Sequence, residues 1–188
     1  MHKRGSTLFA AIATVMALAA SAGCSEDRNW LDDPALAPPS ATASAVDPAD
    51  EQIRIDVIKV YNLYRETEVK AQLAADFQNQ DLAKYTADPL LGDLRNELLQ
   101  KKMAGVVAKG RPVWSPKVVK IDKHERPYLA SIEDCYDATN WDVIDTKTGK
   151  SVAVEGQPRK FLMLAEAVQG PDNRWVIRKV TEQRERSC

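Results

Sequence analysis

The stretch Asp47–Tyr64 reads DPADEQIRIDVIKVYNLY and sets the first element of the fold. Asp47 can accept hydrogen bonds from the free backbone N–H groups of a helix start, and Pro48 suits the first turn because no donor is needed there. Apolar residues then recur at spacings of four, three and four, at Ile53, Val57, Val60 and Tyr64. The pattern predicts an amphipathic helix with a wide buried face that runs to about Ala75.

Two more helical segments follow. Residues 82–85 are predicted to form a short turn of helix, and Asp88-Pro89 repeats the start pattern seen at Asp47-Pro48. Leucines at 91, 94 and 98 lie on one row of the helix that follows. Gly110 is the predicted end of this second long helix, because glycine favours the conformation that closes a helix.

After Gly110 the period of the sequence changes to that of strands. The predicted strands are 113–121, 128–136, 141–145, 151–154, 159–169 and 175–182. Pro112 and Pro116 indicate an edge strand or a bulge. Residues 146–150 and 170–173 are turn sequences, so each predicts a hairpin between the strands on either side of it.

Helices followed by antiparallel strands are typical of an α+β fold. We expect the N-terminal helices to pack on one face of a curved antiparallel sheet. In the strand 128–136, alternate residues share a face, which places Asp134 with Ile132 and Tyr136.

The first 23 residues have the pattern of an export signal. Lys3 and Arg4 form a basic head, and Thr7–Ala20 is an uncharged apolar run of 14 residues. As a helix the run would span about 21 Å, which is short for a membrane crossing and typical of a signal peptide. Residues 1–23 are therefore predicted to be removed.

Ala22 and Gly23 before Cys24 resemble the lipobox of bacterial lipoproteins, although Ser21 departs from its usual Leu, Val or Ile. That resemblance implies a fatty (diacylglyceryl, palmitate-bearing) anchor on Cys24 and a location on the outer face of the cell membrane. Ala20-Ser21-Ala22 is also an A-x-A cleavage pattern, which would give a secreted protein that begins at Gly23. An uncleaved membrane anchor is a third alternative.

Residues 24–47 contain Pro34, Pro38 and Pro39 without apolar periodicity, which predicts a disordered linker. The remaining residues, 48–188, are enough for one domain. Without Lys3 and Arg4 the chain has 24 basic and 27 acidic side chains. This balance argues against nucleic acid as a partner.

The chain has three cysteines. If Cys24 carries lipid, an exported domain is expected to join Cys135 to Cys188 in a disulfide. A disulfide to another protein and two free thiols are the alternatives. Metal binding is not expected, because His124 is the one histidine of the mature chain and no cysteines are closely spaced.

The order of elements over residues 48–188 resembles the cystatin-like cone of the nuclear-transport-factor-2-like superfamily. The residues that carry the resemblance are 81–85 (DLAKY), 94–96 (LRN), 105–110 (GVVAKG), Asp134-Cys135 and Cys188. They are similar to those of a group of secreted actinobacterial lipoproteins without an established activity. The layout is more distantly similar to accessory proteins of mammalian-cell-entry lipid transporters. The resemblance implies a pocket between the first helix and the sheet, and it implies pairing of two cones through their sheets, hence a homodimer.

Five residues are candidates to line that pocket: Tyr61, Tyr64, Trp114, Asp134 and Tyr136. Aromatic rings with a polar tip suit small ligands, and an inward carboxylate can act as a base. At helical or strand spacing the same residues also serve as plain core, and Asp134 also suits a solvated strand end. His124 lies among charged neighbours, which is typical of a solvated turn.

No nucleophile motif, phosphate-binding glycine loop or Cys–His pair occurs in the sequence. We therefore predict no catalytic residue and no cofactor. The expected function is a non-enzymatic binding or accessory domain, tethered outside the cytoplasm, with an envelope protein or a small apolar ligand as partner. The alternatives are a pocket enzyme of the polyketide-cyclase-like or dehydratase-like type and a structural envelope protein.

Overall fold

The computed structural model describes residues 47–188. The predicted signal peptide 1–23, the predicted lipidation at Cys24 and positions 24–46 of the predicted linker lie outside the described residues. Within residues 47–188, no helix has an apolar stretch long enough to cross a bilayer.

Helix α1 (Pro48–Ala74) confirms the first predicted helix. An Asp47 carboxylate oxygen accepts a hydrogen bond from the Ala49 amide at 2.9 Å. Asp50 adds negative charge to the first turn, where the helix dipole is positive. The helix ends where Ala75 takes a left-handed conformation with φ 45°. The predicted start and end are therefore both confirmed.

Two shorter helices follow, α2 (Leu82–Tyr85) and α3 (Leu90–Ala104). The prediction that the second long helix ends at Gly110 was wrong, because α3 ends at Gly105. Gly105 has φ 69°, and its N–H bonds to carbonyls of the last helical turn, which is a common way for glycine to close a helix. Val106 and Val107 come next, and β-branched residues favour strands. Residues 106–110 therefore form a strand that the sequence analysis assigned to a helix.

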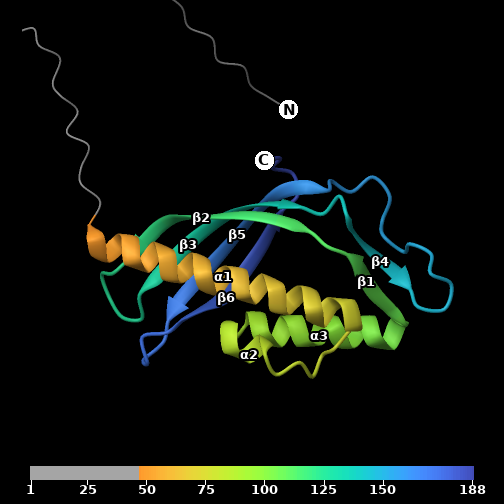
Figure 1. Cartoon of the computed structure of the whole chain (residues 1–188), viewed down its shortest axis with the longest axis horizontal. Helices are drawn as coiled ribbons and strands as arrows, with labels where there is room; N and C mark the ends of the chain where they lie inside the picture. Colours follow the sequence, from red (N-terminus) through yellow and green to blue (C-terminus); the bar gives the residue numbers. More distant parts are fainter. Residues whose placement is uncertain (1–46) are drawn as a thin grey trace, which may run out of the picture. The chain divides into compact units, whose positions relative to one another are not determined.

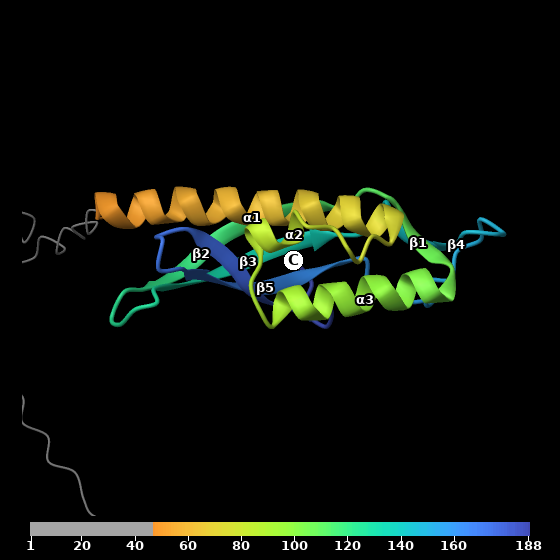
Figure 2. The same ribbon diagram turned by 90° about the horizontal axis from the view of Figure 1, so that it is seen from below.

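The strands are β1 (Val106–Gly110), β2 (Val113–Asp122), β3 (Leu129–Asp137), β4 (Trp141–Asp145), β5 (Lys160–Gln169) and β6 (Trp175–Gln183). Four of them form an antiparallel sheet in the order β2-β3-β5-β6, and β1 pairs with β4. Figures 1 and 2 show α1 crossing one face of the curved sheet, with α3 on the same side. This arrangement confirms the predicted α+β fold.

The curvature comes from a bend in one long antiparallel strand pair. Only residues 111–112 separate β1 from β2, and only residues 138–140 separate β3 from β4. Because β1 pairs with β4 and β2 pairs with β3, the ladder continues through the bend. We call the part beyond the bend the β1–β4 arm; in Figure 1 it lies at the right, beside the end of α3.

Gly110 stands at this bend. It has φ 91°, a conformation that L side chains rarely adopt. A Cβ atom on Gly110 would lie 2.0 Å from the carbonyl oxygen of Asn140, which is far inside van der Waals contact. The close approach of the two strands at the bend therefore requires glycine.

We expect Gly110→Ala to lower the free energy of unfolding by about 3 kcal/mol, because the Cβ atom adds a steric clash to an unfavourable φ. Urea denaturation followed by circular dichroism measures the change. Gly156→Ala is the matched control, because Gly156 has φ 78° but no atom lies within 4 Å of the added Cβ. This variant should lower the free energy of unfolding by only about 1 kcal/mol. Equal losses would show that the contact with Asn140 does not matter.

One predicted hairpin formed in full, and the other formed only near its turn. The turn 170–173 joins β5 to β6, which pair as expected. In the other hairpin the turn forms, with the Gly149 amide bonded to the Asp145 carbonyl at 2.8 Å. However, Ser151–Val154 forms only a single bridge, Ile144 to Ser151. On its other edge, β4 pairs along its full length with β1, because the bend brings these two segments side by side.

Strand β2 lies at the edge of the four-stranded sheet, as Pro112 and Pro116 predicted. The register shifts between Val118 and Lys120, so the predicted bulge is present as well. Arg54 on α1 donates from Nη1 to the Val118 carbonyl at 2.8 Å. This edge is therefore interrupted by a proline and a bulge, and one of its carbonyls is capped by a side chain.

The core lies between the helices and the inner face of the sheet. Residues of β3 alternate as predicted, with Ala130, Ile132, Asp134 and Tyr136 buried. They face a helical surface that includes Val57, Tyr61, Tyr64, Leu94 and Leu98. Asp134 is thus a carboxylate on the buried side of the sheet.

Candidate functional site

Arg65 is the charged centre of the buried face of α1, with 2% of its surface exposed. Its Nε and Nη2 donate to the Tyr61 hydroxyl at 2.9 and 2.7 Å. Its Nη1 donates to the Glu68 carboxylate at 2.9 Å and lies 3.3 Å from the Tyr64 hydroxyl. The guanidinium carbon is 5.1 Å from the ring centroids of Tyr61, Tyr64 and Tyr136. Three aromatic rings and a carboxylate therefore surround the buried cation.

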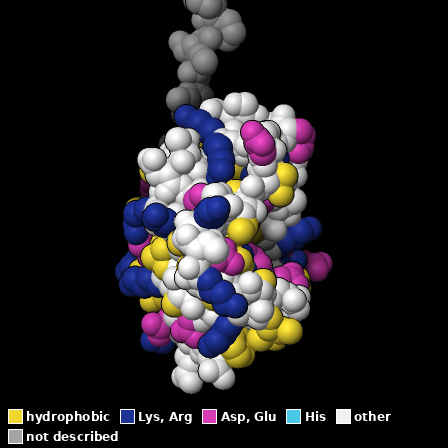
Figure 3. All heavy atoms as spheres, turned by 90° about the vertical axis from the view of Figure 1, so that its right-hand side faces the viewer, with side chains coloured by type: hydrophobic (Ala, Val, Ile, Leu, Met, Phe, Trp, Pro, Cys, Tyr) yellow, Lys and Arg dark blue, Asp and Glu magenta, His cyan; other side chains and the backbone are white. Residues whose placement is uncertain are grey.

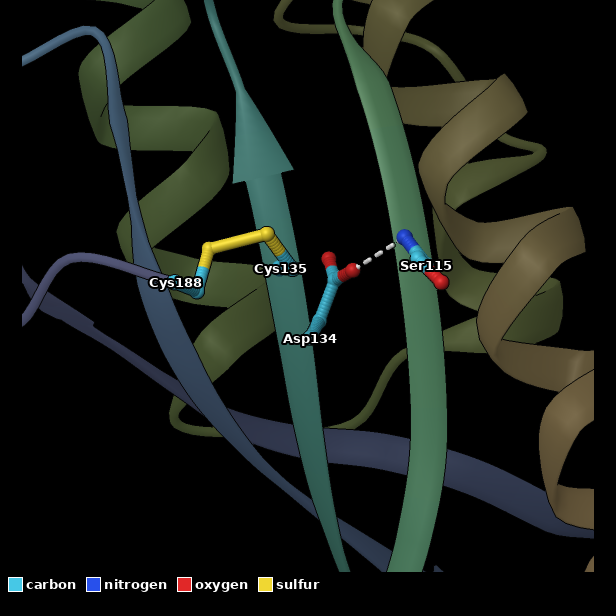
Figure 4. Close-up of a disulfide and its surroundings, with 4 residues drawn as sticks. All are labelled: Ser115, Asp134, Cys135 and Cys188. Carbon is cyan, nitrogen blue, oxygen red and sulfur yellow. Dashed lines mark hydrogen bonds between the residues drawn. A yellow bond between two sulfur atoms is a disulfide. The ribbon is translucent and has the colours of Figure 1, made fainter.

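Asp134 supplies a second carboxylate to this group and is 0% exposed. Its Oδ2 accepts from the Tyr61 hydroxyl at 2.8 Å and lies 3.8 Å from Nη2 of Arg65. Its Oδ1 accepts from the Ser115 amide at 2.7 Å, and Figure 4 shows this bond from β3 to β2. Both oxygens of the carboxylate are thus occupied. We call Tyr61, Tyr64, Arg65, Glu68, Asp134 and Tyr136 the buried arginine cluster.

Helical and strand periodicity bring the cluster together. Tyr61, Arg65 and Glu68 are spaced by four and three residues, so they lie on one side of α1. Asp134 and Tyr136 are two residues apart on β3, so both point toward that helix. Each member therefore has its position fixed by a regular element and not by a loop.

Burial controls the ionisation of the three tyrosines. It raises the pKa of Tyr61 well above its ordinary value; the Arg65 charge opposes this shift, and the Asp134 charge adds to it. Burial likewise raises the pKa values of Tyr64 and Tyr136, helped by Glu68. For Arg65, burial lowers the pKa, but the tyrosines and Glu68 outweigh that effect and the net pKa shift is upward.

These shifts predict a loss of stability in alkali. Because the folded-state pKa values of the three tyrosines exceed the unfolded value of about 10, the native state holds protons that the unfolded state releases. The free energy of unfolding is therefore expected to fall as the pH rises above about 10. Phenolate absorbance from these residues should appear only as the circular dichroism signal is lost. Tyr64→Phe should reduce that coupled absorbance; ionisation of all tyrosines before unfolding would contradict the prediction.

A cavity of about 360 Å³ opens beside the buried arginine cluster. Its walls come from α1, the end of α3, strand β4, the segment 152–159, and the ends of β5 and β6. Tyr136, Trp141 and Met163 supply aromatic and apolar lining, and eight charged side chains surround them. Figure 3 looks at the end of the molecule where the β1–β4 arm lies, and there acidic, basic and apolar side chains alternate.

The five predicted pocket residues divide into three groups. Tyr136 lines the cavity, while Tyr61, Tyr64 and Asp134 pack behind it in the buried arginine cluster. Trp114 lies opposite Tyr136 on β2 and packs against the core groups that contain Tyr61, Tyr64 and Tyr136. Its indole N–H donates to the Asn62 side chain at 3.0 Å. The five residues are thus brought together, but only Tyr136 touches the cavity.

Sequence reasoning missed Arg65 and Glu68, which join the cluster to the cavity wall. A pattern that could have found them was present, because Arg65 follows Tyr61 by four residues and places a charge on a mostly apolar helix face. A charged residue on a buried face requires partners.

Cys135 and Cys188 form the predicted disulfide, with Cα atoms 5.6 Å apart (Figure 4). Strand β5 lies between β3 and β6, so the tail after β6 crosses β5 to reach Cys135. On the way, the Arg186 carbonyl accepts from the Leu162 amide at 2.9 Å. The tail includes Arg184, which lines the cavity. The disulfide therefore holds part of the cavity wall.

No constellation for a metal ion occurs in residues 47–188: no three His, Cys, Asp or Glu side chains are grouped there. His124 lies exposed in the turn between β2 and β3, where its amide donates to the Asp122 carboxylate at 3.1 Å.

No protein-family model and no curated protein matches the sequence. Among solved structures, the chain is similar to the intermembrane space region of the chloroplast protein ARC6, with 10% identity and a TM-score of 0.43, over 66% of this chain and 91% of that one. It is also similar to a ketosteroid isomerase-like protein from Erwinia carotovora atroseptica, with 10% identity and a TM-score of 0.43, over 69% of this chain and 95% of that one.

Proposed function

We propose that residues 48–188 form a non-enzymatic binding domain that takes a small ligand into the cavity beside Arg65. In this proposal a lipid on Cys24 tethers the domain to the outer face of the membrane. The observation that carries the proposal is the saturated buried arginine cluster next to an open cavity. Concave, partly aromatic sites with a few placed polar groups are typical of ligand binding.

The contacts of Asp134 favour binding over catalysis. A general base must be within reach of a substrate proton, but both oxygens of Asp134 already accept hydrogen bonds and the side chain is fully buried. The Tyr61 hydroxyl donates its hydrogen bond to Asp134, and Tyr61 is itself fully buried. A pocket enzyme of the cyclase or dehydratase type would need such a pair to face the cavity, and these two residues pack behind its wall.

The tether rests on the sequence before residue 47. A lipid on Cys24, followed by the proline-rich linker, would hold the cavity just outside the cell, where it could present a ligand to an envelope protein. Plain secretion remains the alternative for this part of the proposal.

Recovery of the protein from membranes tests both parts. We expect small molecules extracted from the wild-type protein to include one that is missing from Ala153→Trp, because Ala153 lines the cavity and a bulky side chain there would fill it. Ala83→Trp is the matched control on an exposed position of α2. A ligand retained by Ala153→Trp, or no ligand at all, would contradict binding in this cavity.

The same preparation tests the anchor. The intact mass of the mature protein should show a diacylglyceryl or triacylated Cys24, and Cys24→Ala should move the protein out of the membrane fraction. An unmodified chain that begins at Gly23 would overturn the lipid tether without affecting the binding proposal.

A further inference from the structure

The charges that line the cavity are mostly paired within the protein. Three of its four cations have a carboxylate neighbour that also lines it. These pairs are Arg65–Glu68 at 2.9 Å, Lys101–Glu97 at 2.7 Å and Arg184–Glu182 at 2.6 Å. Asp142 and Arg159 are the remaining lining charges. No oppositely charged group from residues 47–188 lies within 4 Å of either of them.

Both remaining charges have groups free to bind a ligand. Asp142 is on β4, and its Oδ1 accepts from the Val143 amide at 2.8 Å and from the Ser151 hydroxyl at 2.9 Å. Its Oδ2 has no hydrogen-bond partner in the described part of the chain. Arg159 donates from Nη1 to the Trp141 carbonyl at 2.9 Å. Its Nη2 and Nε have no partner among the described residues.

Trp141 contacts both charged residues through its backbone. It precedes Asp142 in β4, and its carbonyl holds Arg159. Trp141 and Tyr136 both line the cavity. A carboxylate, a guanidinium and two aromatic residues thus contribute to the wall of one cavity. Aromatic faces attract ammonium groups, and the guanidinium fork matches a carboxylate or a phosphate.

We propose that the cavity binds a small zwitterion, with its cationic group at Asp142, its anionic group at Arg159 and its apolar part against Trp141. This inference rests on the proposed function, because it names the ligand class of the same cavity. A purely apolar ligand would cover both charges without pairing them, which is unfavourable. A ligand with one charge would leave the other covered and unpaired. A zwitterion satisfies both.

Two kinds of zwitterion share this chemistry, and the test separates them. Alanyl-alanine carries an ammonium and a carboxylate, while phosphocholine carries a quaternary ammonium and a phosphate. Each is titrated into the oxidised mature protein. Calorimetry measures the affinity, and a shift of the Trp141 indole N–H signal in NMR spectra shows whether the ligand binds near Trp141. N-acetyl-alanyl-alanine and alanyl-alanine amide each lack one charge of the dipeptide. We expect one of the two zwitterions to saturate the Trp141 signal. If it is the dipeptide, each blocked analogue should bind about tenfold more weakly.

Substitutions then locate each charge. Asp142→Asn and Arg159→Gln should each weaken the zwitterion that binds by about tenfold. If that zwitterion is the dipeptide, the Asp142→Asn protein should bind alanyl-alanine and N-acetyl-alanyl-alanine with equal affinity. Glu51→Gln and Lys59→Gln, on α1 away from the cavity, are matched controls that should leave affinity unchanged. Thermal unfolding confirms that each variant is folded.

Two results would overturn the ligand class. One is that neither zwitterion perturbs Trp141; the other is that the charge-blocked analogues bind as tightly as the parent dipeptide. If either occurs while wild-type protein still yields a molecule that Ala153→Trp lacks, the zwitterion inference fails and the binding function stands. If Ala153→Trp changes nothing, the binding function itself fails.

Discussion

Replacing Arg65 with methionine is expected to lower the free energy of unfolding by about 3–5 kcal/mol, the range for removal of one member of a buried charge group. Methionine has similar length and fills the space, so the loss reports the charge. Asp134 and Glu68 would lose the guanidinium that now lies 3.8 and 2.9 Å from their carboxylate oxygens. Chemical denaturation measures the change.

Arg95→Met is the matched control, because Arg95 is exposed on α3 and such changes usually stay within about 0.5 kcal/mol. Adding Asp134→Asn to Arg65→Met should cost less than the sum of the two single changes, since the two changes remove opposite ends of the same 3.8 Å charge pair. A strictly additive pair would mean that Arg65 and Asp134 do not interact.

Removal of the disulfide in the double variant Cys135→Ser/Cys188→Ser is expected to cost about 4 kcal/mol. The bond closes a loop across a separation of 53 residues, and chain-entropy models give about that value for such a loop. Using both serines avoids a free thiol. Denaturation of wild-type protein with and without reductant gives an independent measurement of the same quantity.

The loss should be accompanied by local change at the cavity. Arg184 lies in the tail that the disulfide holds, and its guanidinium carbon is 4.3 Å from the centroid of the Phe161 ring. The backbone amides of residues 184–188 should exchange hydrogen faster in the double variant than in the wild-type protein. Within α1, the amides that exchange most slowly in the wild-type protein should still be the slowest in the variant. Two titratable thiols in the unreduced wild-type domain would contradict the disulfide from the start.

Local sequence patterns predicted most of the fold. The Asp47-Pro48 start, the alternation in β3 and the turn 170–173 each depend on neighbours in the chain, and all three were confirmed. The end of α3 was missed because both Gly105 and Gly110 can close a helix. The partner of β4 was also missed. It depends on a bend that brings residues 106–110 opposite residues 141–145. These segments are far apart in the chain, so no local sequence pattern predicts that they pair.

The candidate site was also predicted in part. Alternation placed Asp134 and Tyr136 on the inner face, and helical spacing placed Tyr61 and Tyr64 toward them. The helical spacing of Arg65 and Tyr61 marked Arg65 as a candidate for the buried face, but it did not identify the three rings as its partners, because a charge on such a face can also reach solvent. The cavity was also beyond reach, since its wall includes the irregular segment 152–159.

The interrupted edge of β2 has a consequence for self-association. Fibril-like growth requires an open row of backbone donors and acceptors onto which another strand can add. On β2, Pro116 has no N–H, the bulge at Val118–Lys120 breaks the repeat, and Arg54 occupies the Val118 carbonyl. A crowded population of these domains would therefore be protected from joining edge to edge through β2 into a continuous ribbon.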